Sequence, residues 1–261
     1  MITKRFLFLF ILWSSFCTAQ DYVQTNRPNY TRPFQKYNDS LRKRNFFISV
    51  AFGIAYPTGE YGSKDTAHNF MIIGPDSTNA KGFANLGFHA NISAGVFISK
   101  HVGVMGKFAL DYNTFDVSTL NAYVNGLNYQ YTLNEPFYIK QYMLGLFGNF
   151  KTNPTTTIWL QGMAGLISAN FPAFTVTINT YNFDFNLEDA NVFAYSLGLG
   201  CEKMISHSTG FLFNLTYTGS ELVYPTMSYN RYYNPPPYTQ NTPVTMAFGS
   251  LDFTIGVVFH L

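Results

Sequence analysis

Five polar residues lie on the less apolar faces of sequence runs that otherwise alternate large apolar with small residues. They are Lys107, Asp111, Glu202, Asp252 and His89. Successive strand residues point to opposite faces, so all five are expected on the face opposite the large apolar residues. The four charged groups could form a gate that controls a pore, or they could neutralise one another as a plug. The histidine could serve as a general base or as a hydrogen-bonded interior residue.

The elements that must position these residues are eight runs with the same alternation. In each run, every second residue is mostly large and apolar, and the residues between are mostly small or polar, which predicts a strand with two unlike faces. Lys140, near the end of one run, is the only charge on the eight apolar faces. The runs span residues 46–56, 85–98, 102–112, 138–150, 158–166, 193–202, 211–218 and 251–261.

Composition decides which side of such strands faces water. Charged residues make up only 11% of the chain and aromatic residues 18%, yet the mean hydropathy is −0.01. Soluble domains carry about 25% charged residues, and a membrane helix needs roughly 18 consecutive apolar residues, which no segment after the first 20 residues offers. The strands therefore predict an all-β, antiparallel up-and-down transmembrane barrel, apolar outside and polar within. The net charge of +2 is too small to indicate a nucleic-acid partner.

The connections between the runs alternate in length. Short turns are predicted around residues 99–101, 151–156 and 204–209, and long loops at 57–82, 114–136, 170–191 and 219–245. Short periplasmic turns and long extracellular loops are typical of outer-membrane barrels. Aromatic residues fit two interfacial girdles, with Tyr56, Tyr112, Tyr138 and Tyr217 at the loop ends and Phe46, Phe150, Phe211 and Phe259 at the turn ends.

The first 45 residues precede the predicted barrel. Lys4 and Arg5, a short apolar stretch and a small residue at Ala19 predict a signal peptide over 1–19. Residues 20–45 form a basic, polar segment, either a flexible linker or a periplasmic contact with an anionic partner. The barrel is expected over 46–261, and its one cysteine, Cys201, excludes an intrachain disulfide.

The final run, Leu251 to Leu261, alternates apolar residues up to Phe259 and Leu261. It resembles the C-terminal signal through which bacterial outer-membrane proteins reach the barrel-assembly machinery. Residues 45 to 261 as a whole resemble the small eight-stranded outer-membrane families, among them the OmpA transmembrane domain, OmpX and OmpW. The resemblance implies a protein of the bacterial outer membrane in contact with its lipids. It does not choose among anchors, adhesins, narrow channels and enzymes.

Enzymes of this size class have sites that the sequence does not reproduce. Lipid A deacylases carry a His-x-Ser pair facing lipid, whereas here His207 and Ser208 are adjacent and lie in a predicted turn. An outer-membrane protease would need acidic and histidine residues on its outer loops, for which Asp65 and His68 are the only pair. We therefore expect no catalytic, cofactor or metal site.

The last long loop is the candidate extracellular binding site. Its tyrosines, Tyr229, Tyr232, Tyr233 and Tyr238, flank a run of three prolines. Tyrosine offers rigid, amphipathic contact area, and proline stiffens the segment that carries it. The loop could bind an extracellular ligand, or it could pack on other loops and cap the barrel. A structural or loop-mediated binding role is the favoured function, with a narrow channel for small or hydrophobic solutes as the alternative and a lipid-modifying enzyme less favoured.

Overall fold

The structure is a computed structural model that describes residues 46–65, 69, 71, 80–126, 129–133, 135–231, 238–240 and 243–261. These residues belong to one compact unit, Leu41–Leu261. The predicted signal peptide (1–19) and basic segment (20–45) lie outside the described residues.

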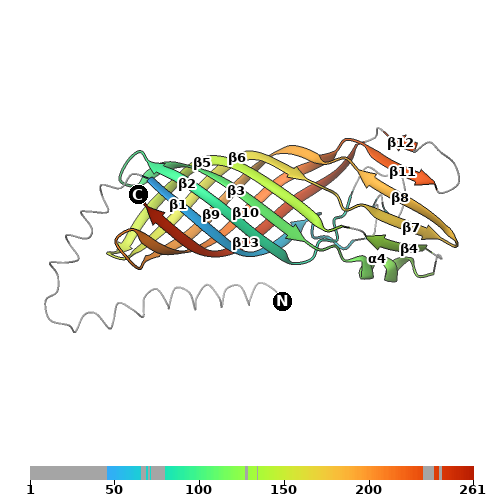
Figure 1. Cartoon of the computed structure of the whole chain (residues 1–261), viewed down its shortest axis with the longest axis horizontal. Helices are drawn as coiled ribbons and strands as arrows, with labels where there is room; N and C mark the ends of the chain where they lie inside the picture. Colours follow the sequence, from blue (N-terminus) through green and yellow to red (C-terminus); the bar gives the residue numbers. More distant parts are fainter. Residues whose placement is uncertain are drawn as a thin grey trace. The chain divides into compact units, whose positions relative to one another are not determined.

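Eight antiparallel strands close into a barrel in the order β1-β13-β10-β9-β6-β5-β3-β2 (Figure 1). The predicted eight-stranded barrel is therefore confirmed, and each predicted run lies within or largely within one strand. The strands are β1 (Phe46–Gly59), β2 (Gly87–Phe97), β3 (Val102–Asn113), β5 (Phe137–Asn153), β6 (Thr156–Ala169), β9 (Ala190–Met204), β10 (Thr209–Tyr224) and β13 (Val244–His260).

The first and last strands seal the barrel. β1 pairs with β13 in a continuous register from Phe47 opposite His260 to Gly59 opposite Phe248. At the rim, the amide of Leu261 donates to the carbonyl oxygen of Phe46 at 2.9 Å. Closure leaves no strand edge unpaired, which is the condition a sheet must meet inside a bilayer.

The two rims of the barrel differ. One rim, which we call the turn end, carries the connections at residues 98–101, 154–155 and 205–208 between consecutive strands. The other rim, which we call the loop end, carries the long connections. Short and long connections therefore alternate along the chain, as predicted.

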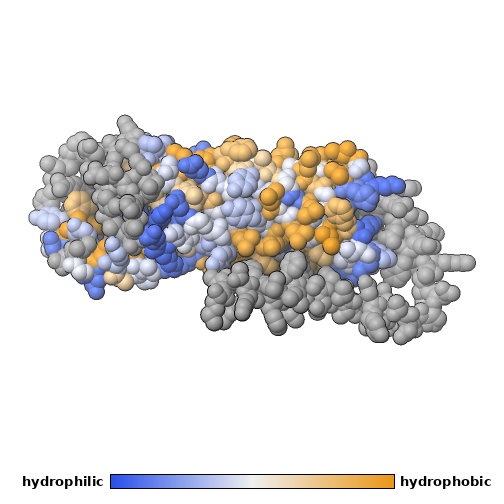
Figure 2. Space-filling view, turned by 180° about the vertical axis from the view of Figure 1, so that it is seen from behind, coloured by the Kyte–Doolittle hydropathy of each residue, from blue (hydrophilic) through white to orange (hydrophobic). Residues whose placement is uncertain are grey.

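The outer surface of the barrel is apolar. The exposed large hydrophobic residues include those at the predicted outward positions of the strands, with Val50, Phe52 and Ile54 of β1 as one example. Figure 2 shows apolar residues over most of the visible barrel surface and polar residues toward both rims. All eight predicted girdle residues are exposed. A further charge lies on the outer face. Lys203 follows the predicted sixth run, is the register partner of the outward-facing Phe211, and lies near the turn end.

Aromatic side chains fill the lumen at the turn end. Phe47, Phe97, Phe147 and Trp159 come from four strands, and three of them are buried. The ring centroids of Phe97 and Phe147 lie 4.9 Å apart, and those of Phe47 and Trp159 lie 5.2 Å apart. These are the edge-to-face spacings at which aromatic rings attract one another. The cluster closes this rim.

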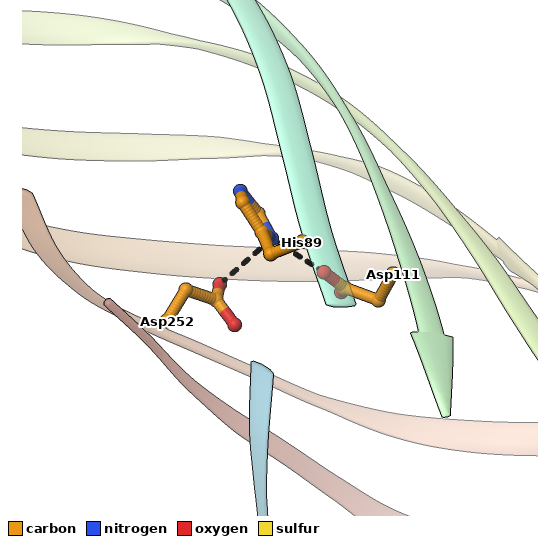
Figure 3. Close-up of side chains that lie close together, drawn as sticks. All are labelled: His89, Asp111 and Asp252. Carbon is orange, nitrogen blue, oxygen red and sulfur yellow. Dashed lines mark hydrogen bonds and ion pairs between the residues drawn. The ribbon is translucent and has the colours of Figure 1, made fainter. Parts of the chain in front are cut away.

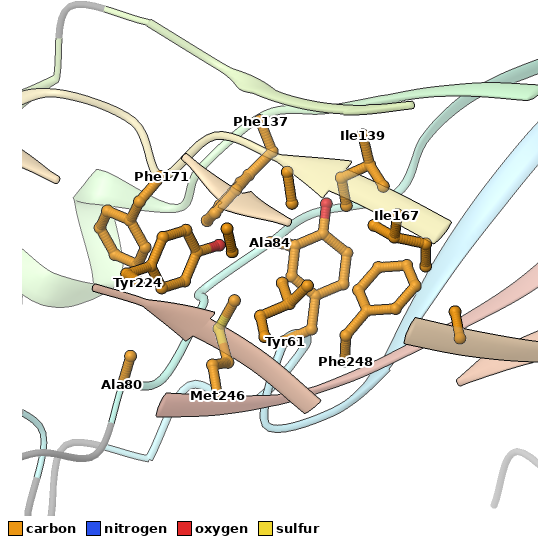
Figure 4. Close-up of a cluster of buried hydrophobic side chains, with 14 of the residues drawn as sticks. Tyr61, Ala80, Ala84, Phe137, Ile139, Ile167, Phe171, Tyr224, Met246 and Phe248 are labelled. Carbon is orange, nitrogen blue, oxygen red and sulfur yellow. The ribbon is translucent and has the colours of Figure 1, made fainter. Parts of the chain in front are cut away.

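A second aromatic cluster closes the loop end (Figure 4). Tyr61 packs edge-to-face on Phe137 at 5.1 Å and lies 5.0 Å from the ring of Phe248. Phe171 packs edge-to-face on Tyr224 at 5.5 Å. All five side chains are buried. Tyr61 follows the end of β1 at Gly59, and its burial raises the pKa of its hydroxyl well above the ordinary value.

The long connections, which the sequence analysis predicted as loops without further detail, contain helix and strand. They contain one helix and a second sheet with the order β12-β11-β8-β7-β4, which continues past the loop end in Figure 1. β10 extends to Tyr224 and β13 begins at Val244, so the last long connection spans residues 225–243 and not 219–245. The added elements are α4 (Val117–Val124), β4 (Tyr129–Leu133), β7 (Phe174–Ile178), β8 (Tyr181–Leu187), β11 (Met227–Arg231) and β12 (Tyr238–Gln240).

The second sheet is joined by polar pairs and by aromatic stacking. Thr175 donates to Asp184 at 2.6 Å, and Thr177 donates to Asn182 at 2.8 Å. Phe174 and Phe185 stack with their ring centroids 4.9 Å apart. Such cross-strand pairs are the contacts that stabilise a short antiparallel sheet.

Asp116 begins the helix α4. Its carboxylate accepts from the Thr119 amide at 3.1 Å, as an N-cap does, and it pairs with Lys64. Partial burial opposes ionisation, but the contacts with Lys64, Ser118 and Thr119 outweigh it and hold the pKa of Asp116 below its ordinary value. No helix among the described residues is long and apolar enough to cross a membrane.

Replacing Asp116 by Ala should loosen α4 without unfolding the barrel. Loss of an N-cap costs about 0.5–2 kcal/mol of local stability. Amide hydrogen exchange should therefore become faster at Thr119 to Val124, with no change in the β2 and β3 amides. The Lys64→Ala variant removes the ion pair but keeps the cap, so it should change exchange less. Equal protection of α4 in wild type and Asp116→Ala would contradict this assignment.

Candidate functional site

The polar centre of the lumen is formed by His89, Asp111 and Asp252 (Figure 3). His89 on β2 and Asp111 on β3 are direct partners in the strand register. Asp252 comes from β13, which is separated from β2 by β1. The side chains of His89 and Asp252 meet across β1, since the inward positions there are the small residues Gly53 and Ala55. A β carbon at Gly53 would clash with the carbonyl oxygen of Phe253.

His89 lies between the two carboxylates. Its Nδ1 atom is hydrogen-bonded to Oδ1 of Asp111 and lies 3.5 Å from Oδ2 of Asp252. All three residues are at most 2% exposed. We call these three side chains the His89 cluster. Because ionised groups this deeply buried are costly unless compensated, the cluster and its neighbours must be considered as one charge system.

Further polar groups hold the outer atoms of the cluster. Gln141 Nε2 donates to Asp111 Oδ2 at 2.5 Å. Ser250 Oγ donates to Asp252 Oδ1 at 2.5 Å. The side-chain amide of Asn91 lies 3.1 Å from His89 Nε2. The sequence analysis assigned no role to these three residues, although Gln141 and Asn91 lie at inward-facing positions of predicted strands. Ser250 lies one residue before the last predicted run.

Glu202 belongs to a separate network at the turn end. Its carboxylate accepts from Trp159 Nε1 at 2.9 Å and pairs with His260 Nε2 at 2.6 Å. The prediction that Glu202 shares a single polar network with Lys107, Asp111, Asp252 and His89 is therefore wrong in its extent. Among the described residues the lumen holds two acid–histidine groups. The sequence analysis missed His260 and Trp159 as polar partners.

Lys107 lies near the His89 cluster without an ion pair to it. The side chain is buried, and the charges of Asp252 and Asp111 act on its ammonium group. Within the described part of the chain, no carboxylate oxygen lies within 4.0 Å of its Nζ atom, so Lys107 takes part in the predicted neutralisation without a direct ion pair. Lys107 instead lines a cavity of about 30 Å³ together with Asn91, Ser93, Gln161, Asn214 and Thr216. This volume is enough for a water molecule to solvate the ammonium group.

The predicted tyrosine site is only partly described. Tyr229 on β11 and Tyr238 on β12 are register partners, so they lie in a hairpin and not in an irregular loop. Tyr232 and Tyr233 lie outside the described residues, as does His68 of the weak Asp65–His68 pair. His207 and Ser208 lie in the turn between β9 and β10.

The geometry of the lumen is suited to compensating charge and not to admitting a substrate. Clusters of mostly buried aromatic side chains lie at both rims, and the polar groups between them bond mainly to one another. The His89 cluster could hold a proton or a cation, but a molecule from outside would first have to displace an aromatic cluster.

Neither protein-family models nor curated protein sequences match this chain. Among solved structures, Neisserial surface protein A is 12% identical with a TM-score of 0.48, and the match covers 83% of this chain and 97% of that one. Ail, the attachment invasion locus protein of Yersinia pestis, is 12% identical with a TM-score of 0.41, covering 84% of this chain and 99% of that one.

The outer membrane protease OmpT from Escherichia coli is also similar, at 8% identity and a TM-score of 0.35, covering 83% of this chain and 97% of that one. The similar structures thus include a surface protein, an attachment protein and a protease. The comparisons assign no activity to this chain, and its barrel fold rests on its own strand pairing.

Proposed function

We propose that the protein is a non-enzymatic barrel of the bacterial outer membrane that acts by binding through its loop end. The continuous apolar surface of the eight strands supports membrane insertion, because an exposed apolar belt of this extent is stable only in lipid. In this orientation the turn end lies in the periplasm and the loop end outside the cell. Outer-membrane lipids contact the belt, and β13 engages the barrel-assembly machinery.

The observation that carries this proposal is the filled lumen. Aromatic clusters occupy both ends, and hydrogen-bonded polar groups occupy the middle. The interior of an eight-stranded barrel is just wide enough to be filled by side chains. A filled barrel supports a role as a membrane anchor for what lies outside it, and it argues against a solute channel.

The elements beyond the loop end supply the binding surface. They form an ordered sheet with a helix beside it, and Asn121 of α4 exchanges two hydrogen bonds with the backbone of Tyr131 on β4. Tyr123, Tyr129 and Tyr181 on these elements are exposed. Tyrosine side chains on a fixed scaffold bury a large contact area at low entropic cost. An extracellular ligand is therefore the expected partner class.

Planar-bilayer recording of the refolded protein tests this proposal against the channel alternative. Folding is verified first by the different migration of unheated and boiled samples on a detergent gel. We expect folded wild-type protein to insert without producing steady conductance steps. Reproducible steps from folded protein would contradict the closed barrel and favour a narrow channel. Recovery of the native protein in the soluble periplasm would contradict the membrane assignment itself.

A further inference from the structure

We propose that His89, Asp111 and Asp252 bind a divalent transition-metal ion, with Zn²⁺ as the representative, inside the barrel. This inference does not depend on the proposed function at the loop end. The three residues come from three strands, and their ligand atoms lie within 4.8 Å of one another. One imidazole nitrogen and two carboxylate oxygens form a donor set that zinc accepts, with a fourth position left for water.

The outer contacts of the two aspartates are those expected of metal ligands. One carboxylate oxygen of each aspartate is already held, by Gln141 for Asp111 and by Ser250 for Asp252. His89 Nδ1 is directed between the two carboxylates, and Nε2 lies 3.1 Å from Nδ2 of Asn91. With a metal on Nδ1 the imidazole proton would sit on Nε2, so the Asn91 amide would turn to accept it through Oδ1. In metal sites, such outer partners fix the orientation of the ligands and raise their affinity for the metal.

Two buried polar atoms near the cluster have no hydrogen-bond partner among the described residues. One is Asp252 Oδ2, the atom of that carboxylate that faces His89. The other is the hydroxyl oxygen of Tyr61, which lies above the cluster and close enough for both carboxylate charges to act on it. Buried polar groups are normally paired. An ion bound within the His89 cluster, with its water, would supply a partner for both atoms.

Charge balance favours a cation at this point. Each ionised aspartate places a negative charge in the buried centre, and Lys107 supplies one positive charge without an ion pair to either. Further compensation comes from a proton, on His89 or on a carboxylate, or from a metal ion in its place. A proton on Nδ1 bonds to Asp111 and leaves Asp252 Oδ2 unbonded at 3.5 Å. A metal ion would bind all three donor atoms, and its water could reach Tyr61.

Zinc content of the folded, untagged protein tests the site. Protein refolded with Zn²⁺ and then dialysed should retain about one zinc per chain, because a buried site gains its affinity on folding. His89→Gln and Asp252→Asn should abolish retention. His260→Gln is the matched control, since it removes a second lumen histidine that belongs to no group of three candidate ligands among the described residues. It should leave zinc content unchanged.

The second-sphere variant Ser250→Ala should bind zinc more weakly by about 10-fold to 100-fold. Folding of each variant is checked by its gel shift on heating. If the ligand variants do not fold, wild-type protein alone decides: Zn²⁺ should raise the temperature at which its gel mobility changes. Folded wild-type protein without retained zinc and without that temperature shift, or equal zinc in wild type and His89→Gln, would show that a proton is the only cation.

Discussion

Replacing Ile255 by Arg should strongly reduce the amount of folded protein in the membrane. Ile255 lies in the middle of β13, it is 51% exposed, and its register partners Phe52 and Phe213 are also exposed. A charged side chain on the lipid face of a barrel costs about 2–4 kcal/mol at the bilayer midplane. Because β13 also closes the barrel on β1, the penalty falls on the strand whose pairing completes the fold.

The control is the neighbouring residue on the same strand. Thr254→Ser changes an inward-facing, buried side chain by one methyl group and adds no charge. It should leave the heat-shifted gel band and the membrane fraction close to wild type. If both substitutions reduced folded protein equally, the assignment of faces on β13 would be wrong.

The barrel could be predicted from the sequence because each of its faces repeats over many residues. β1 alternates outward Val50, Phe52 and Ile54 with inward Ala51 and Gly53, and a shift by one residue would expose every inward side chain to lipid. A period of two residues sustained over ten or more positions therefore fixes both the strand and its faces. The register of the β2–β3 hairpin was also accessible, since His89 and Asp111 are equally distant from Lys100 in the turn.

The second sheet could not be placed in the same way, although part of its signal was present. Tyr181, Phe183, Phe185 and Leu187 alternate with Asn182, Asp184 and Asn186 along β8. The run is short, and its neighbours β7 and β11 have five residues each. Periodicity alone cannot distinguish runs of this length from polar loops. Their pairing also depends on partner strands that lie far away in the sequence.

The composition of the lumen site was predictable, but its contacts were not. Alternation places Lys107, Asp111, Glu202 and Asp252 inside, and the structure buries all four. Which of them meet depends on the strands between them. Asp252 reaches His89 because β1 presents Gly53 and Ala55 there, whereas Glu202 meets His260 and Trp159 at the other end of the lumen. Such contacts depend on the size of the side chains on the strand between the two polar residues. The polar residues themselves do not reveal that size.

Replacing Lys107 by Met should destabilise the barrel while keeping its side-chain volume. Lys107 is the only lysine or arginine whose charge acts on the buried Asp111 and Asp252 among the described residues. Removing one partner of a direct buried ion pair costs about 3–5 kcal/mol. Lys107 acts on the carboxylates without a direct pair, so the loss should lie below that range, but the carboxylates would still lose their nearest lysine in a low-dielectric interior. The urea midpoint of chelator-treated protein in lipid vesicles, read from the heat-shifted gel band, should therefore fall markedly.

The matched control is Lys140→Met. Lys140 is on the adjacent strand β5, but it is exposed on the outer face near the strand's loop end, so its amine can reach the interface. Its loss should change stability by no more than about 1 kcal/mol. Neither variant should conduct, because the aromatic clusters at both rims remain in place. Equal midpoints for the two variants would mean that Lys107 carries no compensating charge, and conductance in Lys107→Met alone would mean that this lysine, and not the aromatic clusters, closes the barrel.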